Sequence, residues 1–265
     1  MSGRQVCYEY DGTFGGFLTC VFESYRNKEE PVCFLRPEDD RYTLWETRRV
    51  DTREEQAKRV WRGVVRNVSP SAAELASRGF LTCLEEKELH LWRFLRYAFQ
   101  RGSRVMADLG DDRVDVLRRA VQHLNEEAHL YTGFVRFSDY DGVLLGEIEP
   151  KNRVLPLLRP HFTQRYNTEA FLLYDRTHKE ALVHRPGQWA IVPMEEFSLA
   201  PPGEGEREYR RLWRQFFETV SIEGRYNPRC QNTHLPKRYR AMMTEFREEQ
   251  GTALPEKHKA PIGLR

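Results

Sequence analysis

The hydrophobic residues of this chain change from a helical to an alternating spacing between residues 133 and 193, and this change constrains the fold most strongly. Five short runs rich in Val, Ile, Leu, Phe and Tyr lie in this stretch, at residues 133–137, 143–149, 170–174, 180–184 and 188–192. The pairs Asp141-Gly142 and Pro186-Gly187 are typical of tight turns. Short connections favour antiparallel neighbours, because a parallel crossover needs about a dozen residues or more. The predicted fold class is therefore α+β, with an antiparallel sheet (about residues 133–193) covered by N-terminal and C-terminal helices.

Apolar residues at helical spacing predict helices before and after this sheet. The predicted helices lie at residues 14–25, 55–68, 71–79, 85–101, 112–133 and 206–220. Thr52 with Glu55, and Ser71 with Glu74, have the spacing of capping boxes. Apolar residues surround so much of the helix at 85–101 that we expect it to be buried on more than one side.

The remaining segments give weaker signals. Residues 6–10 and 42–50 are predicted as short strands, and Asp11-Gly12-Thr13 is predicted to form a turn and the cap of the first helix. Residues 29–41 are charged and contain two prolines, so they are predicted as a loop. Residues 154–166 also contain two prolines and are predicted to be irregular.

These patterns suggest a division of the chain into three parts. Residues 1–83 are predicted as an N-terminal helical region with one or two short strands. Residues 84–249 form the predicted α+β core domain, although no flexible linker marks the boundary near Cys83. Residues 250–265 are predicted to be a flexible tail.

Composition narrows the classes of function. The 265 residues are 40% hydrophobic and 12% aromatic, enough for a sizeable core. The 42 basic and 40 acidic residues leave a net charge of only +2, so an attraction to nucleic acid must come from local clusters. Five cysteines, an odd number without a C-x-x-C pair, argue against a zinc knuckle and against a secreted disulfide scaffold. With no membrane-spanning run and no signal-peptide core near the start, we expect a cytoplasmic protein.

The strongest local charge asymmetry is the C-terminal basic window, which we define as residues 224–240. It combines five cations with polar and aromatic residues and no acid: Arg225, Arg229, Lys237, Arg238 and Arg240 lie among Tyr226, Asn227, Gln231, Asn232 and Tyr239. Guanidinium groups bind phosphate in pairs of hydrogen bonds, amides can read base edges, and tyrosine rings can stack on bases. The alternative is a solvated loop that pairs with acids of neighbouring helices.

A second window without acids, the central basic window, covers residues 150–168. Its basic residues are Lys151, Arg153, Arg159, His161 and Arg165. If the sheet brings the two windows together, they form one positive surface. Taken alone, this window also fits a solvated edge loop.

One group of residues has an arrangement seen in metal-dependent nucleases. Asp139 and Asp141 precede Glu149 and Lys151 across a predicted hairpin, as in sites that hold magnesium and position a water. Pro150 would interrupt the strand between them, and acidic residues are common in turns.

Other catalytic or cofactor motifs are weak or absent. His123, Glu126 and His129 lie on one predicted helix, but their spacing matches no zinc motif, and surface salt bridges explain them better. The sequence has no glycine-rich phosphate loop and no cofactor fingerprint, so we expect no cofactor on this chain.

Three separated segments resemble a known family. They are YEYDGTFGGFLTCVFESYRNKEEP near the start, GFVRF with GEIEP and LPLLRPHFTQRY in the middle, and RYNPRCQNTHLPKRYR near the end. Together they are similar to a bacterial DNA-metabolism or DNA-repair family, a domain of unknown function associated with a radical-SAM partner protein. The resemblance extends from Tyr8 to about Phe246 and keeps the order of the motifs.

The resemblance implies a role in DNA repair or base modification, because some family members resemble fusions with a uracil-DNA-glycosylase-type domain. This chain has no such domain and no C-x-x-x-C-x-x-C triplet, so radical chemistry would belong to the partner. No catalytic residue is carried over. The resemblance places site positions at His161, Phe162 and Arg165, and at matching positions of the C-terminal basic window, including Pro236.

The leading hypothesis is a DNA-binding component of a repair or base-modification system that acts with a radical-SAM partner. The candidate nucleic-acid-binding residues are Arg159, His161, Phe162, Arg165, Arg225, Tyr226, Asn227, Arg229, Gln231, Lys237, Arg238 and Tyr239. One alternative is an enzyme acting on nucleic acid, either a metal-dependent nuclease or a glycosylase-like protein. The other is a protein-interaction scaffold whose basic surface docks onto an acidic partner. The sequence does not distinguish DNA from RNA.

Overall fold

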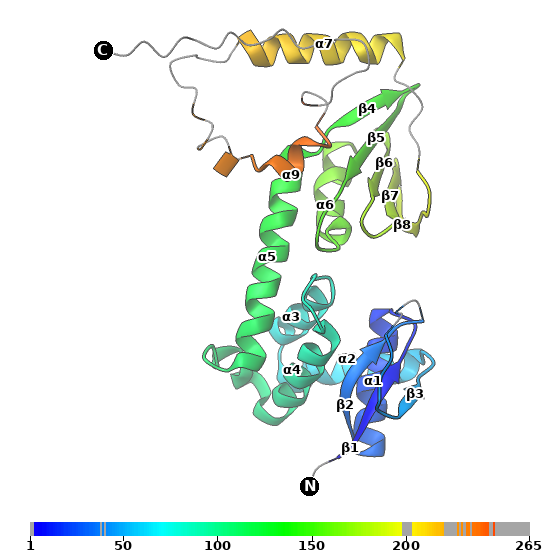
Figure 1. The fold of residues 1–265 in the computed structure, drawn as a ribbon, viewed down its shortest axis with the longest axis vertical. Coiled ribbons are helices and arrows are strands. Elements are labelled where there is room, and N and C mark those ends of the chain that lie inside the picture. Colours follow the sequence, from blue (N-terminus) through cyan, green and yellow to red (C-terminus); the bar gives the residue numbers. More distant parts are fainter. Residues whose placement is uncertain are drawn as a thin grey trace, which may run out of the picture. The chain divides into compact units, whose positions relative to one another are not determined.

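The computed structural model describes residues 3–37, 39, 41–197, 203–219, 227, 229, 232–233, 235–243 and 246. The chain forms two compact units (Figure 1). The first contains Met1–His129 and Lys151–Leu157, and the second contains Leu130–Pro150 and Leu158–Arg265. The border between the units therefore falls inside a helix after His129, whereas the predicted boundary lay near Cys83. The predicted tail at 250–265 lies outside the described residues.

The first unit begins with a three-stranded parallel sheet in the order β2–β1–β3. Its strands are β1 (Arg4–Glu9), β2 (Glu29–Leu35) and β3 (Thr47–Arg49), and α1 (Phe14–Asn27) connects the first two. The Thr13 hydroxyl caps α1 by accepting the Gly16 N–H at 2.9 Å, which confirms that prediction.

The prediction of a loop at residues 29–41 was wrong for its first half, which is β2. The charged start of this strand misled the sequence reading, because Glu29 is buried. Its carboxylate accepts the Tyr8 hydroxyl at 2.7 Å and pairs with Arg48 at 2.8 Å. A buried carboxylate with two such partners is tolerated inside a sheet.

A disulfide joins Cys7 and Cys33 on the neighbouring strands β1 and β2. Nothing in the spacing of the five cysteines predicted this pair. Cys20 is a buried free thiol and Cys83 is an exposed one.

The helices of the first unit surround one hydrophobic core. They are α2 (Glu54–Gly63), the π-helical η1 (Val64–Val68), α3 (Pro70–Phe80), α4 (Lys87–Arg101), the 3-10 segment η2 (Gly102–Ala107) and most of α5 (Asp112–Phe134). The prediction for α4 is confirmed, because Leu91, Phe94 and Leu95 are fully buried and Trp92 is 4% exposed. Together with the buried Leu89, these residues span about 220° of the helix circumference at 100° per residue.

Both predicted capping boxes were wrong. No side chain caps α2, and the Thr52 hydroxyl instead donates to Asp11 at 2.6 Å. Ser69 caps α3 by accepting the Ala72 N–H at 3.1 Å, and Pro70 occupies the first turn, where its missing N–H removes no helical hydrogen bond.

The second unit contains a five-stranded sheet in the order β4–β5–β6–β7–β8 (Figure 1). Its strands are β4 (Phe137–Tyr140), β5 (Val143–Ile148), β6 (Ala170–Asp175), β7 (Glu180–Arg185) and β8 (Gln188–Pro193). The prediction of antiparallel pairing is correct for three neighbouring pairs but wrong for β5 and β6, which are parallel.

The parallel pair depends on α6 (Leu155–Arg165), which crosses from β5 to β6 where an irregular segment was predicted. Its two prolines misled that prediction. Pro156 lies in the first turn, where no N–H is needed, and Pro160 lies inside the helix. The Thr163 hydroxyl adds a hydrogen bond within this helix by donating to the Arg159 carbonyl at 2.8 Å.

Aromatic side chains of α6 pack against this sheet. Phe162 and Phe171 are 3% and 1% exposed, and both contact the Phe137 ring. The Phe137 ring also lies over Gly146, where a Cβ atom would be 3.1 Å from it. The helix and the sheet thus share one apolar layer.

The C-terminal helix α7 (Glu204–Thr219) does not cover the sheet with its apolar side, contrary to the prediction. Tyr209 is 74% exposed and Phe216 is 58% exposed. Its contacts with β4 are polar, because Arg210 donates to the Ser138 hydroxyl at 2.7 Å and Glu206 accepts the Asp139 N–H at 3.1 Å. In the part of the chain that the structure describes, no helix is long and apolar enough to cross a membrane.

Candidate nucleic-acid interface

The C-terminal basic window packs onto the end of α5 through Tyr239. This residue belongs to the short helix α9 (Lys237–Arg240) and is only 2% exposed. Its ring centroid lies 5.0 Å from that of Tyr131 and 5.1 Å from that of Phe134. Edge-to-face aromatic contacts of this kind give a buried, oriented anchor.

The central basic window packs onto the start of β4 through α6. The ring centroid of Phe137 lies 5.4 Å from that of Phe162 and 5.2 Å from that of Tyr166. Phe162 lies in α6, and Tyr166 directly follows Arg165, the last residue of this helix.

The two anchor points, Phe134 and Phe137, are three residues apart in the chain. Even a fully extended backbone spans only about 10 Å over that separation. Both basic windows are therefore fastened to one short segment, residues 134–137, which we call the α5–β4 junction. The aromatic residues Tyr239 and Phe162 therefore pack against neighbouring residues of the chain.

Cations of both windows face outward beside these buried rings. Arg165, Lys237 and Arg238 are exposed. The Arg165 guanidinium lies 5.7 Å from the Tyr166 ring centroid, and the Arg238 guanidinium lies 4.7 Å from that of Tyr239. Neither Arg165 nor Lys237 forms an ion pair with any residue that the structure describes. Their charge is available to an external anion.

The arginines of the first unit differ in this respect. Arg113 pairs with Asp111 at 2.6 Å, and Arg119 pairs with Asp115. These ion pairs hold the pKa of both aspartate carboxyls below their ordinary value through hydrogen bonds from the guanidinium groups. The net charge near zero thus does not reveal that Arg113 and Arg119 form ion pairs, whereas Arg165 and Lys237 form none with the described residues.

A further basic residue of the central window lies at the edge strand β8. The Arg159 guanidinium is 4.2 Å from the centroid of the Trp189 ring, and Trp189 is 51% exposed. A guanidinium over an exposed indole holds both planes in place, and either plane can stack on a base.

Three predicted site residues point inward and pack the fold. Phe162 and Tyr239 are buried, so their rings are not available for stacking on bases in this conformation. His161 is partly buried, and its Nε2 atom has no hydrogen-bond partner.

The remaining predicted site residues are divided between described and undescribed positions. Asn227 and Arg229 are exposed. Arg225, Tyr226 and Gln231 lie outside the residues that the structure describes.

The nuclease arrangement is contradicted by strand register. Asp139 pairs with Leu144 near one end of β5, whereas Glu149 follows the other end. Five residues at about 3.3 Å each separate these ends by about 16 Å. Asp139 and Asp141 therefore cannot share one magnesium ion with Glu149 and Lys151.

The histidines of α5 serve other contacts. His123 Nδ1 lies 3.0 Å from the amide nitrogen of Asn152, and Glu126 accepts a hydrogen bond from Gln122 at 2.9 Å. His123 and Asn152 also line a cavity of about 400 Å³ with the exposed Cys83. The other walls of this cavity are mainly apolar side chains of the first unit, so it has no cluster of charges for an anionic ligand.

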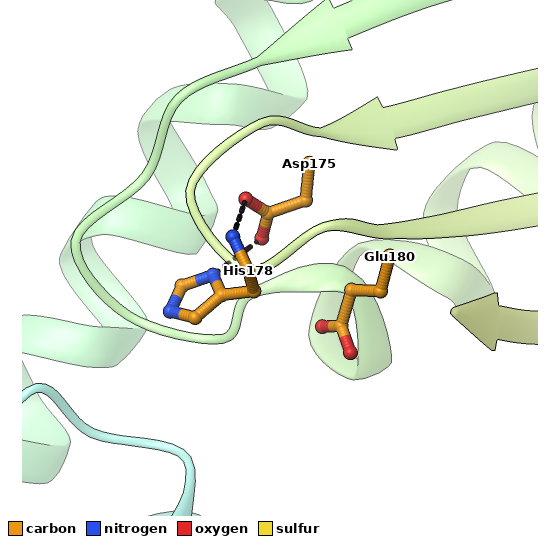
Figure 2. A group of neighbouring side chains, drawn as sticks. All are labelled: Asp175, His178 and Glu180. Atoms are coloured by element: carbon orange, nitrogen blue, oxygen red, sulfur yellow. Dashed lines mark hydrogen bonds and ion pairs between the residues drawn. The ribbon is translucent and has the colours of Figure 1, made fainter. Parts of the chain in front are cut away.

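Sequence reasoning missed one group with metal-ligand chemistry, which consists of Asp175, His178 and Glu180 (Figure 2). A search of the described residues for three or more histidine, cysteine or carboxylate side chains with ligand atoms close together finds this group. The available signal was the D-x-x-H-x-E spacing across the turn between two predicted strands.

Comparison with known families adds one finding. The model of a domain of unknown function, DUF4130, matches residues 85–245, and a comparison with curated proteins found no match. The matched part is more than half of the chain, begins beside the predicted boundary after Cys83 and contains both basic windows. The chain belongs to the DUF4130 family.

Proposed function

We propose that this protein binds DNA on the surface formed by the two basic windows around the α5–β4 junction. The observation that carries the proposal is the common anchoring of Tyr239 and Phe162 on that junction. Arg165 lies three residues after Phe162, and Lys237 and Arg238 directly precede Tyr239, so exposed cations of the second unit lie near both anchors.

The chemistry of these side chains fits a phosphate backbone. Arg165 and Arg238 offer forked donors that match phosphate oxygens, and Lys237 adds a point charge. Each phosphate that a cation neutralises releases condensed counterions, and this release drives binding at low salt. The exposed Trp189, with the partly buried Arg159 over its ring, adds a stacking surface for an unpaired base.

The finer assignment is a role in DNA repair or base modification with a radical-SAM partner. It is supported by the family resemblance of the three sequence motifs. The chain itself lacks a triplet of clustered cysteines, so it supplies the DNA surface and the partner supplies the radical chemistry.

The test is a salt titration of binding to a fluorescent DNA duplex by the full chain and by an Arg165→Gln/Lys237→Gln variant. Loss of two phosphate contacts reduces the slope of log affinity against log salt by about 1.8. Between 50 and 200 mM salt, the affinity of the original protein should then fall about tenfold more than that of the variant.

The matched control is Arg118→Gln/Lys58→Gln, which removes two exposed, ion-paired cations of the first unit. This control should keep the original slope. A folded Arg165/Lys237 variant with unchanged affinity and slope would show that the two windows are not the DNA surface. Absence of DNA binding by the original chain would favour the scaffold alternative.

The enzyme alternative has a nuclease form and a glycosylase-like form. The strand register argues against the nuclease form, because it separates Asp139 from Glu149, whereas the glycosylase-like form does not depend on these residues. Incubation of DNA with the chain and Mg²⁺ or Mn²⁺ tests the nuclease form directly. Cleavage that is abolished by Glu149→Gln would restore the nuclease hypothesis.

A further inference from the structure

The turn between β6 and β7 brings three metal-ligating side chains together (Figure 2). Asp175 is the last residue of β6, Glu180 is the first of β7, and the two are partners in the antiparallel register. His178 lies in the turn between them. One ligand atom from each residue lies within 4.8 Å of the others.

Backbone contacts fix the position of Asp175. Its Oδ1 atom accepts the N–H groups of Thr177 and His178 at 3.0 and 3.1 Å, and its Oδ2 atom lies 2.7 Å from Nδ1 of His178. The Arg176 N–H donates to the Ile148 carbonyl at 3.0 Å, which ties the turn to the end of β5. The aspartate and imidazole are thus oriented before any ligand arrives, as metal sites require.

The group combines two carboxylates with one imidazole. Asp175 is fully buried, and its ion-pair partner among the described residues is His178. The neighbouring Lys179 pairs with Glu195 at 2.9 Å instead. A buried carboxylate with a second carboxylate nearby is costly unless positive charge lies between them. A metal ion held by the three side chains would supply this positive charge.

We propose that Asp175, His178 and Glu180 bind one divalent transition-metal ion of the zinc or manganese class. The imidazole nitrogen selects against calcium and magnesium, which prefer oxygen ligands alone. Two donors on one ion at about 2.1 Å lie about 3 Å apart, close to the distance already present between Asp175 and His178. The Glu180 carboxylate must approach by side-chain rotation, which leaves the hairpin register unchanged.

Three protein ligands leave at least one coordination position for water or another ligand. To bind the ion through Nδ1, the His178 imidazole must carry its proton on Nε2. This site is independent of the proposed DNA surface, and each can fail without the other.

The test uses the full chain without an affinity tag, stripped with EDTA and titrated with Zn²⁺, Mn²⁺ or Co²⁺ by calorimetry. We expect one equivalent to bind, a Co²⁺ absorption spectrum typical of mixed nitrogen and oxygen ligands, and a rise in Tm on metal addition. His178→Ala and Glu180→Gln should each weaken binding at least tenfold. Glu180→Gln changes an already partly exposed side chain, so it remains informative if His178→Ala does not fold.

Two control variants separate this site from adventitious binding. Glu195→Gln removes a nearby exposed carboxylate, and Cys83→Ser removes the exposed thiol. Both should keep the affinity of the original protein. The proposal is overturned if no stoichiometric binding occurs, if His178→Ala and Glu180→Gln bind as tightly as the original chain, or if Cys83→Ser alone abolishes binding.

Discussion

Lys87 is a buried cation whose charge should make the stability of the first unit depend on pH. It is 8% exposed at the start of α4, where its ammonium lies 3.4 Å from the Thr82 carbonyl and 4.9 Å from the centroid of the Phe80 ring. Burial lowers the pKa of Lys87 from 10.5 to about 8. Glu88 opposes this effect, while Arg36 and other positive groups add to it.

The magnitude and sign follow from this pKa. The difference between 10.5 and about 8 is about 2.5 pH units, which corresponds to about 3 kcal/mol. Between pH 8 and 10.5 the unfolded chain binds more protons at this lysine than the folded chain does. The free energy of unfolding should therefore rise with pH through this window, and the full cost of the buried charge should remain below pH 8.

The experiment compares urea unfolding of the original chain and of Lys87→Met at pH values from 7 to 10.5, followed by tryptophan fluorescence. Titrations of other groups cancel in the difference between the two proteins. The free energy of unfolding of the original chain should gain up to about 3 kcal/mol relative to the variant across the window. The original chain should show no such gain relative to Lys58→Met, a change of an exposed lysine on α2.

A difference between the original chain and Lys87→Met that stays constant from pH 7 to 10.5 would refute the reasoning. It would mean that the ammonium reaches water or an unrecognised carboxylate in the folded state. An equal gain of the original chain relative to Lys58→Met would show that the effect comes from general charge repulsion.

Three further changes test the packing described above. Gly146→Val should destabilise the second unit by about 1–3 kcal/mol in urea unfolding, because its Cβ atom would be 3.1 Å from the Phe137 ring, and an unchanged midpoint would contradict that contact. Replacing Cys7 and Cys33 together by Ser should cost about 3 kcal/mol, since the disulfide closes a loop with a sequence separation of 26, and a reductant should reproduce the loss in the original chain. Tyr239→Ala should cost about 3 kcal/mol of unfolding free energy in the second unit, whereas Tyr239→Phe should cost much less if the ring acts mainly by packing.

Much of the local structure could be predicted from the sequence. Alternating runs predicted β5, β6, β7 and β8 within a residue or two, because strand faces alternate wherever one side packs on a core. Helical spacing predicted α4, because apolar residues recur about every 3.6 residues on the buried side of a helix. Such patterns lie within one segment, so they can be recognised without knowing which other segments it packs against.

The missed features depend on contacts between distant residues. Pairing of β5 with β6 was wrong because the intervening prolines concealed α6, and only the crossover makes the parallel register possible. Glu29 looked like a loop residue until its partners Tyr8 and Arg48 were in place. Single-sequence patterns carry no information on such partners.

The composition of the candidate sites could be predicted from the sequence, but the orientation of their side chains could not. The absence of acids in the two basic windows was visible in the sequence, but the inward orientation of Phe162 and Tyr239 was not. The metal-ligating group was missed because Asp175 and Glu180 become neighbours only through the hairpin register. A spacing of five residues has no meaning for metal binding until the turn is known.

In both basic windows the aromatic residues and the cations have separate roles. Phe162 and Tyr239 face the α5–β4 junction, while Arg165 and Lys237 face solvent a few residues away. Buried rings reduce the motion of the backbone that carries the cations, and less conformational entropy is then lost when the cations bind phosphate. Removing a ring should therefore weaken the proposed DNA binding through disorder, with little change in salt slope, whereas removing a cation should change the slope itself. The two kinds of variant thus separate anchoring of the surface from contact with the phosphate backbone.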